Sequence, residues 1–204
     1  MNDLIFYTNP MSRGRIVRWM LEEIGCNYRS EIIEHGPAMK APSYLAVNPM
    51  GKVPALSHYG KVVTETPAIL AYLADAFPEA GLAPPPQKRQ AYYRWLFFAA
   101  GPLEAAVTDN NLGWAVPEDK RGMVGYGSYE QTVEVLAAAV SGGNYLVDEK
   151  FSAVDIFIGS HIIWGTQFGS LPQRPEFDAY KKLVSGREAY LRANELDDAL
   201  AANT

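Results

Sequence analysis

A run of three prolines at residues 84–86 constrains the fold of this chain more than any other feature. Proline has a fixed φ and no N–H group, so neither a helix nor a central strand can pass through such a run. The run closes a segment, residues 77–86, that also contains Pro78 and Gly81 and is typical of a linker. We therefore predict a first domain over residues 1–77, a linker over residues 78–86 and a second domain over residues 87–204.

Before the linker, short β-rich runs alternate with helical patterns. We expect strands at residues 4–7, 28–33, 53–56 and 61–64, helices at residues 16–24 and 67–75, and a further helix between the second and third strands. In the order β-α-β-α-β-β-α, the first two strands are parallel because a crossover helix joins them. The last two form a hairpin around His58, Tyr59 and Gly60. The first domain is therefore predicted to be a small α/β layer.

After the linker, apolar residues recur at three- and four-residue spacing, as in residues 87–107 and 129–140. This pattern predicts an all-helical bundle for the second domain. Ser152, followed three positions later by Asp155, matches a capping box before an apolar run. We interpret the box as structural, and its loss should cost about 1 kcal/mol.

The charge balance limits the kinds of partner that the chain can have. It contains 18 Lys plus Arg against 23 Asp plus Glu, a net charge of −5, and no block of basic residues. Non-specific binding to nucleic acid depends on basic residues that release counterions, so no nucleic-acid partner is expected. A small molecule or a protein is the expected partner.

The cysteine and histidine content excludes two further classes. The single cysteine, Cys26, has no partner for a disulfide within the chain, and His35, His58 and His161 are too widely spaced for a metal site. The start lacks the basic region of a signal peptide, and the most apolar stretch, residues 95–103, is far shorter than the ~20 residues of a membrane span. We expect a cytoplasmic protein with no metal and no membrane span.

A first motif lies at residues 48–56, where a turn leads to Val53 and to Pro54 at the start of a strand. Proline cannot donate to a sheet, so Pro54 lies at an edge, at a strand start or in a cis turn. One interpretation is a simple junction between loop and strand. The other is an open edge, where the N–H and C=O of Val53 pair with an extended peptide.

A second motif, residues 64–69, is typical of a helix start, with Thr66 as N-cap and Pro67 as the first helical residue. The free N–H groups of such an end bind carboxylates, and Glu65 beside them can accept a hydrogen bond from an ammonium group. The segment is therefore either a simple capped helix or a site for the head group of an amino acid.

A third motif, residues 7–15, runs from the first strand into the first helix. Ligands of open α/β sheets bind beyond the carboxyl ends of strands, where the hydroxyls of Tyr7 and Ser12 are expected. Both residues also have structural interpretations. Ser12 can cap the helix, and Tyr7 can be a half-buried strand residue.

Taken together, the chain resembles the cytosolic glutathione transferase superfamily, in particular its bacterial type, over essentially its whole length. The matching segments are residues 7–15, 19–25, 48–56, 64–69 and 152–155. The resemblance implies a thioredoxin-like first domain, an all-helical second domain, glutathione as co-substrate and no metal. Pro54 then looks like the cis-proline of the family.

The resemblance also implies a glutathione-binding set, consisting of Ser12, His35, Lys52, Val53, Pro54, Glu65 and Thr66. Val53 looks like the residue whose backbone pairs with the cysteinyl part of glutathione. Glu65 and Thr66 look like the γ-glutamyl binders, and Lys52 and His35 would face the glycyl carboxylate.

The group that activates the thiol is a tyrosine, a serine or a cysteine in this superfamily. Residues 9–12 contain no cysteine, which leaves two candidates. Ser12, followed by Arg13 and later Trp19, resembles members of the serine type, whereas Tyr7 lies where the tyrosine classes have theirs. We favour Ser12, because a hydroxyl at a helix N-terminus gains from the helix dipole as well as from the hydrogen bond.

The implied reaction is attack of the glutathione thiolate on a small, largely apolar electrophile. Lowering the thiol pKa by about two units requires roughly 2.7 kcal/mol, which one charge-assisted hydrogen bond and a helix dipole can supply. We expect an apolar wall for the electrophile from the second domain, and candidate pocket residues are Met11, Tyr92, Trp95 and Trp114. Family members are homodimers, and Met50 is a candidate contact.

Two alternatives remain open at this stage. Glutathione-dependent peroxide reduction or isomerisation would use the same thiolate with another co-substrate. A non-catalytic binding or regulatory protein could have the same fold, because a fold does not determine a function.

Overall fold

The structure is a computed structural model that describes residues 3–202. It divides into two compact units, the first made of Met1–Gly81 and Arg187–Thr204 and the second of Leu82–Gly186. The first division, after Gly81, falls inside the segment expected to be a linker, residues 78–86. Each unit is described separately below.

The first unit contains a four-stranded sheet in the order β2-β1-β3-β4. Strand β1 (Leu4–Thr8) is parallel to β2 (Arg29–Ile32) and antiparallel to β3 (Ala55–His58), and β4 (Lys61–Thr64) is antiparallel to β3. The predicted parallel pair and the closing hairpin are both confirmed.

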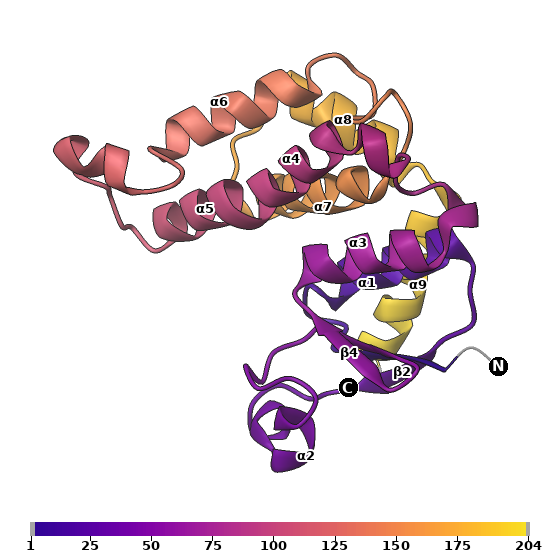
Figure 1. Ribbon diagram of the computed structural model, residues 1–204. Helices are drawn as coiled ribbons and strands as arrows, with labels where there is room; N and C mark the ends of the chain where they lie inside the picture. Colours follow the sequence, from indigo (N-terminus) through magenta and orange to yellow (C-terminus); the bar gives the residue numbers. More distant parts are fainter. Residues whose placement is uncertain (1–2, 203–204) are drawn as a thin grey trace. The chain divides into compact units, whose positions relative to one another are not determined.

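Two helices of the first unit, α1 (Gly14–Ile24) and α3 (Thr66–Ala76), pack against each other and against the sheet (Figure 1). Their buried apolar residues form the core with the inner face of β1. These residues include Leu4, Phe6, Ile16, Val17, Met20, Leu21, Ile69, Leu70 and Leu73. A 3-10 turn (Pro37–Lys40) and the short α2 (Pro42–Leu45) lie away from α1 and α3, and a further turn (Pro78–Ala80) follows α3.

The C-terminal helix, α9 (Glu188–Ala201), packs along α1 and belongs to the first unit. The second unit ends at Gly186, so the C-terminal helix groups with the first unit, whereas the predicted second domain extends to residue 204. The physical reason is a set of ion pairs between α1 and the C-terminal segment, whose partners are at least 164 residues apart in the sequence. The pairs are Arg15 with Asp198, Arg18 with Asp197, Glu22 with Arg192 and Glu23 with Arg187.

The second unit is helical, as predicted. Its helices are α4 (Gln90–Phe98), α5 (Glu104–Asn111), α6 (Tyr129–Val140), α7 (Ala153–Phe168) and α8 (Pro175–Ser185), with 3-10 turns at Pro86–Lys88 and Glu118–Met123. A π-helical turn, Ala99–Leu103, joins α4 to α5 and accommodates Pro102, which has no N–H for a regular helix. Among the helices of residues 3–202, none has both the length and the apolar character needed to cross a bilayer.

The predicted capping box at the start of α7 is confirmed. The Ser152 hydroxyl accepts from the Val154 N–H at 3.3 Å, and the Asp155 carboxylate accepts from the Ser152 N–H at 2.9 Å. Asp155 is fully buried and also accepts from the Tyr180 hydroxyl at 2.6 Å and from the Leu146 N–H at 2.9 Å. Burial raises the pKa of Asp155, and these donors partly oppose the rise. The box thus connects α7 to α8 and to the preceding loop.

Candidate functional site

Four strand ends meet at one edge of the sheet in the first unit. In the register of the sheet, Tyr7 lies opposite both Glu31 and Ala55, and Ala55 lies opposite Thr64. Neighbouring strands are ~4.8 Å apart, so the segments that join these residues at the edge lie next to one another. The segments contain the whole predicted glutathione-binding set, with Ser12 after β1, His35 after β2, Lys52, Val53 and Pro54 before β3, and Glu65 and Thr66 after β4.

Val53 has a free backbone at this edge. The peptide bond between Val53 and Pro54 is cis, as the resemblance implies, and Pro54 is buried. Within residues 3–202, neither the N–H nor the C=O of Val53 is hydrogen-bonded to another protein group. Strand β3 begins two residues later, at Ala55. This is the geometry that the open-edge interpretation of the motif requires.

The loop before Val53 is held by a residue that sequence reasoning missed. The Lys52 carbonyl accepts hydrogen bonds from the Tyr44 hydroxyl at 2.7 Å and from the Asn48 side-chain amide at 2.8 Å. Burial, with a smaller contribution from Tyr7, raises the pKa of Tyr44 to about 12, so Tyr44 remains a donor at neutral pH. Because Tyr44 lies outside the motif, no local pattern indicates this contact.

The cationic side chains at the edge differ in their contacts. The Lys40 ammonium donates to the carbonyls of Met50 and Gly51 at 2.9 and 3.1 Å and so stabilises the loop. Lys52 and His35 are both exposed, and within the described part of the chain neither side chain has an ion-pair partner. Both side chains are therefore open to solvent at this edge.

The start of α3 differs by one residue from the prediction. Thr66 is the first helical residue rather than the N-cap, and Pro67 is the second. Glu65 is the N-cap and its carbonyl accepts from the Ile69 N–H at 2.9 Å. No side chain caps the helix, so its first N–H groups are available to an anion. Glu65 has a φ of 66°, a backbone conformation that is unfavourable for glutamate and that the turn from β4 into α3 imposes.

The Ser12 hydroxyl is engaged in the loop between β1 and α1. It donates to the Asn9 carbonyl at 2.7 Å and accepts from the Gly14 N–H at 2.9 Å. Ser12 is not itself the N-cap, which is Arg13, but its hydroxyl satisfies one N–H of the first turn. A Cβ atom on Gly14 would overlap the Thr8 hydroxyl, so only glycine fits where the loop enters α1.

Tyr7 and Asn9 frame this loop. Tyr7 is half-buried, with its ring centroid 6.0 Å from that of Tyr44, and within residues 3–202 its hydroxyl has no hydrogen-bond partner. Asn9 is buried, donates to the Ile33 carbonyl at 3.1 Å and accepts from the Met11 N–H at 2.9 Å. Asn9 therefore joins the loops that follow β1 and β2, a role that sequence reasoning did not identify.

The predicted pocket residues differ in how exposed they are. Tyr92 is fully buried and Trp95 is 9% exposed, so both pack inside the second unit. Helical spacing identifies a buried face, but it does not distinguish a packed core from the wall of a cavity. Met11, in the first unit, and Trp114, in the second, are 70% and 67% exposed.

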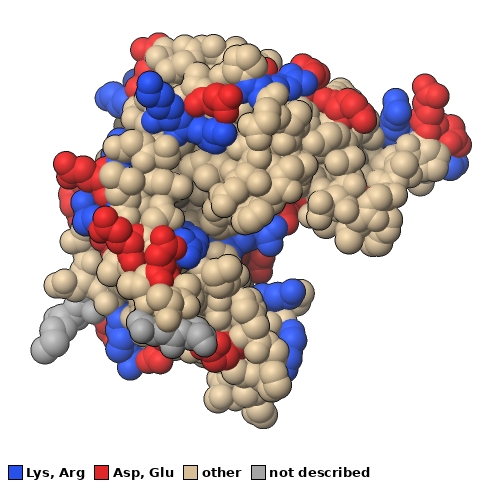
Figure 2. Space-filling model, turned by 180° about the vertical axis from the view of Figure 1, so that it is seen from behind, with Lys and Arg blue, Asp and Glu red and all other residues tan. Residues whose placement is uncertain are grey.

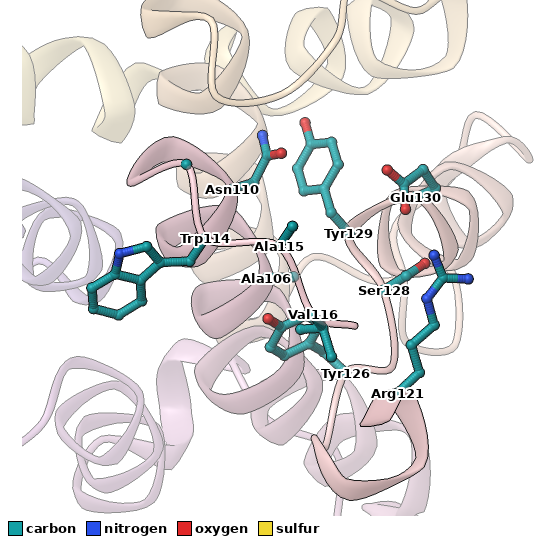
Figure 3. Close-up of a pocket in the computed structure, with 11 residues that line it drawn as sticks. Ala106, Asn110, Trp114, Ala115, Val116, Arg121, Tyr126, Ser128, Tyr129 and Glu130 are labelled. Carbon is teal, nitrogen blue, oxygen red and sulfur yellow. The ribbon is translucent and has the colours of Figure 1, made fainter. Parts of the chain in front are cut away.

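Trp114 lines a cavity of about 230 Å³ within the second unit. Figure 3 shows Trp114 on one side of the cavity and Arg121 and Glu130 on the other. The other lining residues are Ala106, Asn110, Gly113, Ala115, Val116, Tyr126, Ser128 and Tyr129. Both tyrosine hydroxyls donate to protein oxygens, which leaves a wall of mixed apolar and polar character.

The charged residues form no cluster typical of a metal site. Within residues 3–202, no group of three or more His, Cys, Asp and Glu side chains is arranged to hold a metal ion. Figure 2 shows acidic and basic side chains interleaved over the face that it draws. Cys26 lies after the carboxyl end of α1, and burial raises the pKa of its thiol.

Comparison with known proteins gives consistent matches. Residues 11–76 match the family described as "Glutathione S-transferase, N-terminal domain". Glutathione S-transferase 1 of Dianthus caryophyllus is 30% identical over 166 residues, 74% of this chain and 69% of that protein. Maleylacetoacetate isomerase of Pseudomonas aeruginosa is 26% identical over 189 residues, 87% of this chain and 89% of that protein. A solved sphingomonad glutathione S-transferase complexed with glutathione has a TM-score of 0.76 at 25% identity, covering 95% of this chain and 98% of its own.

Proposed function

Because this chain belongs to the glutathione S-transferase family, we propose that it binds glutathione at the sheet edge of the first unit and activates its thiol for attack on small, largely apolar electrophiles. The observation that carries the proposal is the free N–H and C=O of Val53, next to the ends of all four strands. An extended peptide segment pairs with such a backbone by strand addition. The cysteinyl residue of glutathione offers the complementary N–H and C=O.

The order of the strands supports one orientation of the tripeptide. Across the sheet, Glu65 follows β4, Val53 precedes β3, Ser12 follows β1 and His35 follows β2. A tripeptide laid along this edge has its γ-glutamyl end at Glu65, its cysteinyl residue between Val53 and Ser12, and its glycyl end towards His35. The sequence of contacts thus matches the chemical order of glutathione.

The two charged ends of glutathione find complementary groups in this orientation. The uncapped start of α3 and the Thr66 hydroxyl bind the α-carboxylate of the γ-glutamyl residue, and Glu65 accepts from its ammonium group. Lys52 and His35 face the glycyl carboxylate. These contacts bind the ground state, so they set affinity for glutathione more than turnover.

We assign thiol activation to Ser12, with Tyr7 as the alternative. To donate to the sulfur, the Ser12 hydroxyl rotates away from the Asn9 carbonyl and exchanges a neutral hydrogen bond for a charge-assisted one. Its oxygen can still accept from the Gly14 N–H, which polarises it. Tyr7 would not have to give up a hydrogen bond in order to donate to the sulfur, but its hydroxyl does not lie at a helix N-terminus and so receives no stabilisation from a helix dipole.

In the reaction, the thiol releases its proton to solvent and the thiolate sulfur attacks an electrophilic carbon. A C–S bond forms as the bond to the leaving group breaks, and the leaving group departs with the electron pair. We assign an apolar contact of the electrophile to Met11, which is 70% exposed in the loop that also contains Ser12. The similarity to maleylacetoacetate isomerase favours one second candidate, isomerisation, in which the sulfur adds to an activated double bond and is later expelled.

We further propose that the chain forms a homodimer and is a cytoplasmic protein. Met50 is 66% exposed in the loop before Val53, and Tyr93 and Phe97, one turn apart on α4, are 43% and 71% exposed. Tyr93 and Phe97 are neighbours on one face of α4, and a contiguous exposed apolar patch is typical of an interaction surface. Gel filtration over a wide concentration range tests the dimer, and a monomer volume throughout would contradict it.

Titration of reduced glutathione into the protein across pH tests the proposed function. The ultraviolet difference spectrum measures bound thiolate, and we expect an apparent thiol pKa well below the ~8.5 of a free thiol. Binding without thiolate, or no binding, would contradict the proposal and favour a non-catalytic role. Activity with apolar electrophiles and with a cis double-bonded substrate then distinguishes conjugation from isomerisation.

A further inference from the structure

The loop that contains Ser12 is connected to the C-terminal helix through Arg15. From the first turn of α1, the Arg15 Nε donates to the Pro10 carbonyl at 2.6 Å. The other guanidinium nitrogens reach α9, with Nη2 2.7 Å from an Asp198 carboxylate oxygen and Nη1 3.4 Å from the Asn194 side-chain oxygen. One side chain thus joins the loop to residues that lie 179 and 183 positions later in the sequence.

The carbonyl that Arg15 holds lies within the hydrogen bonds that orient Ser12. The preceding residue, Asn9, accepts from the Ser12 hydroxyl through its carbonyl and from the Met11 N–H through its side chain. Pro10 lies between these two contacts. Holding the Pro10 carbonyl fixes the peptide plane between Pro10 and Met11, and the fixed φ of proline limits rotation relative to the Asn9 peptide. The contact thereby restrains the position of the Ser12 side chain.

The attachment of α9 to α1 does not depend on Arg15. Arg18 and Asp197 form a buried ion pair at 2.7 Å between the same two helices. Near the other end of α1, Arg187 donates to both carboxylate oxygens of Glu23 at 2.6 and 2.7 Å. Removing the α9 partners of Arg15 should therefore leave α9 on α1 while releasing the guanidinium.

We propose that α9 takes part in glutathione activation: Asn194 and Asp198 orient Arg15, a positioning residue, and Arg15 holds Pro10 so that the Ser12 hydroxyl faces the bound thiol. The inference rests on the proposed function and extends it to the C-terminal helix. The planar guanidinium group explains why an arginine is needed at position 15, because its N–H groups have fixed directions and reach three acceptors, on Pro10, Asn194 and Asp198.

The test compares a double variant, Asn194→Ala with Asp198→Ala, with a control, Arg187→Gln. Both remove ties between α1 and the C-terminal segment, but only the double variant affects Arg15. For the double variant we expect kcat to fall about tenfold and the apparent pKa of the bound thiol to rise, with the Kd of glutathione within a few-fold of wild type. We expect the control to retain wild-type kcat and thiol pKa, whatever its stability in urea.

A second comparison tests whether α9 acts through Arg15. Arg15→Lys keeps the charge but loses the fork, and we expect it to reduce kcat about as much as the double variant does. Combining all three substitutions should then cause no further loss, because the residues act in one chain of contacts. Additive losses would overturn the assigned route.

Hydrogen exchange separates failure of this inference from failure of the proposed function. We expect the Met11 and Gly14 amides, which donate to Asn9 and Ser12, to exchange roughly tenfold faster in the double variant than in the control. This result would support the link to α9 even for a protein that did not activate glutathione. Equal exchange in the two variants, or an unchanged kcat in an active enzyme, would overturn the inference.

Discussion

Replacing Ser12 with alanine gives the most direct test of the activation mechanism. The hydroxyl donates to the Asn9 carbonyl at 2.7 Å and accepts from the Gly14 N–H at 2.9 Å. Activation requires the donor to move to the sulfur while the acceptor side keeps its contact. The substitution therefore removes the donor to the thiolate and one contact at the helix start together.

The size of the effect follows from this exchange of hydrogen bonds. A bond to a charged group contributes about 1.5–3 kcal/mol, and the neutral bond that Ser12 gives up contributes about 1 kcal/mol. The net stabilisation of the thiolate is therefore about 0.5–2 kcal/mol, whose middle corresponds to roughly one pKa unit. In Ser12→Ala we expect the pKa of bound glutathione to rise by about one unit, and kcat below that pKa to fall about tenfold.

The assay measures bound thiolate by ultraviolet difference spectra across pH, together with kcat and the Kd of glutathione. Ser12→Ala also loses a hydrogen bond at the helix start, which costs about 1 kcal/mol of stability. Ser128→Ala is the matched control, because it removes the cap of α6 in the second unit, where the Gln131 N–H donates to Ser128 at 3.2 Å. An unchanged thiol pKa in Ser12→Ala, with a raised pKa in Tyr7→Phe, would refute the assignment and favour Tyr7.

Three further predictions concern binding, stability and pH. Glu65→Ala should weaken glutathione binding about tenfold in calorimetry while leaving kcat at saturating glutathione nearly unchanged, and a loss confined to kcat would contradict its role as a binding residue. Asp155→Asn should lower the free energy of unfolding in urea by about 2–4 kcal/mol, because an amide nitrogen would face buried donors such as the Tyr180 hydroxyl, and a loss below ~1 kcal/mol would contradict this reasoning. Burial raises the pKa of Tyr44 to about 12, whereas an unfolded tyrosine titrates near ~10. Between these two pKa values the folded chain keeps a proton that the unfolded chain loses, so the free energy of unfolding should fall as pH rises from about 10 to about 12. Tyr44→Phe should show a smaller fall, and the same dependence of unfolding free energy on pH in both proteins would contradict the raised pKa.

Much of the fold could be predicted because its signals are local. The prolines at residues 84–86 interrupt any helix or strand, the alternating runs before them form the sheet, and the capping box uses two residues three positions apart. The residue types of the site were also visible, since Val53, Pro54 and Glu65 lie at strand and helix ends that a linear pattern marks. Their meeting at one edge follows from the strand order once the sheet is known.

Contacts between distant segments could not be predicted in this way. The positive φ of Glu65 is set by the turn from β4 into α3. The hydrogen bond from the Tyr44 hydroxyl to the Lys52 carbonyl forms only when the loop that contains Lys52 packs against α2. Tyr92 is fully buried in the second unit, and helical spacing alone does not distinguish a packed core from the wall of a cavity.

The sequence by itself determined the type and order of the four strands and of the helices α1 and α3, to within one or two residues at their starts, and a division of the chain near residue 81. Only the tertiary structure decided that α9 joins the first unit and that Arg15 reaches both Pro10 and Asp198. The physical reason is that the periodicity of a sequence depends only on residues near one another in the chain, and therefore shows which face of a helix is buried or charged. The partner of that face depends on shape and charge complementarity across the whole folded chain.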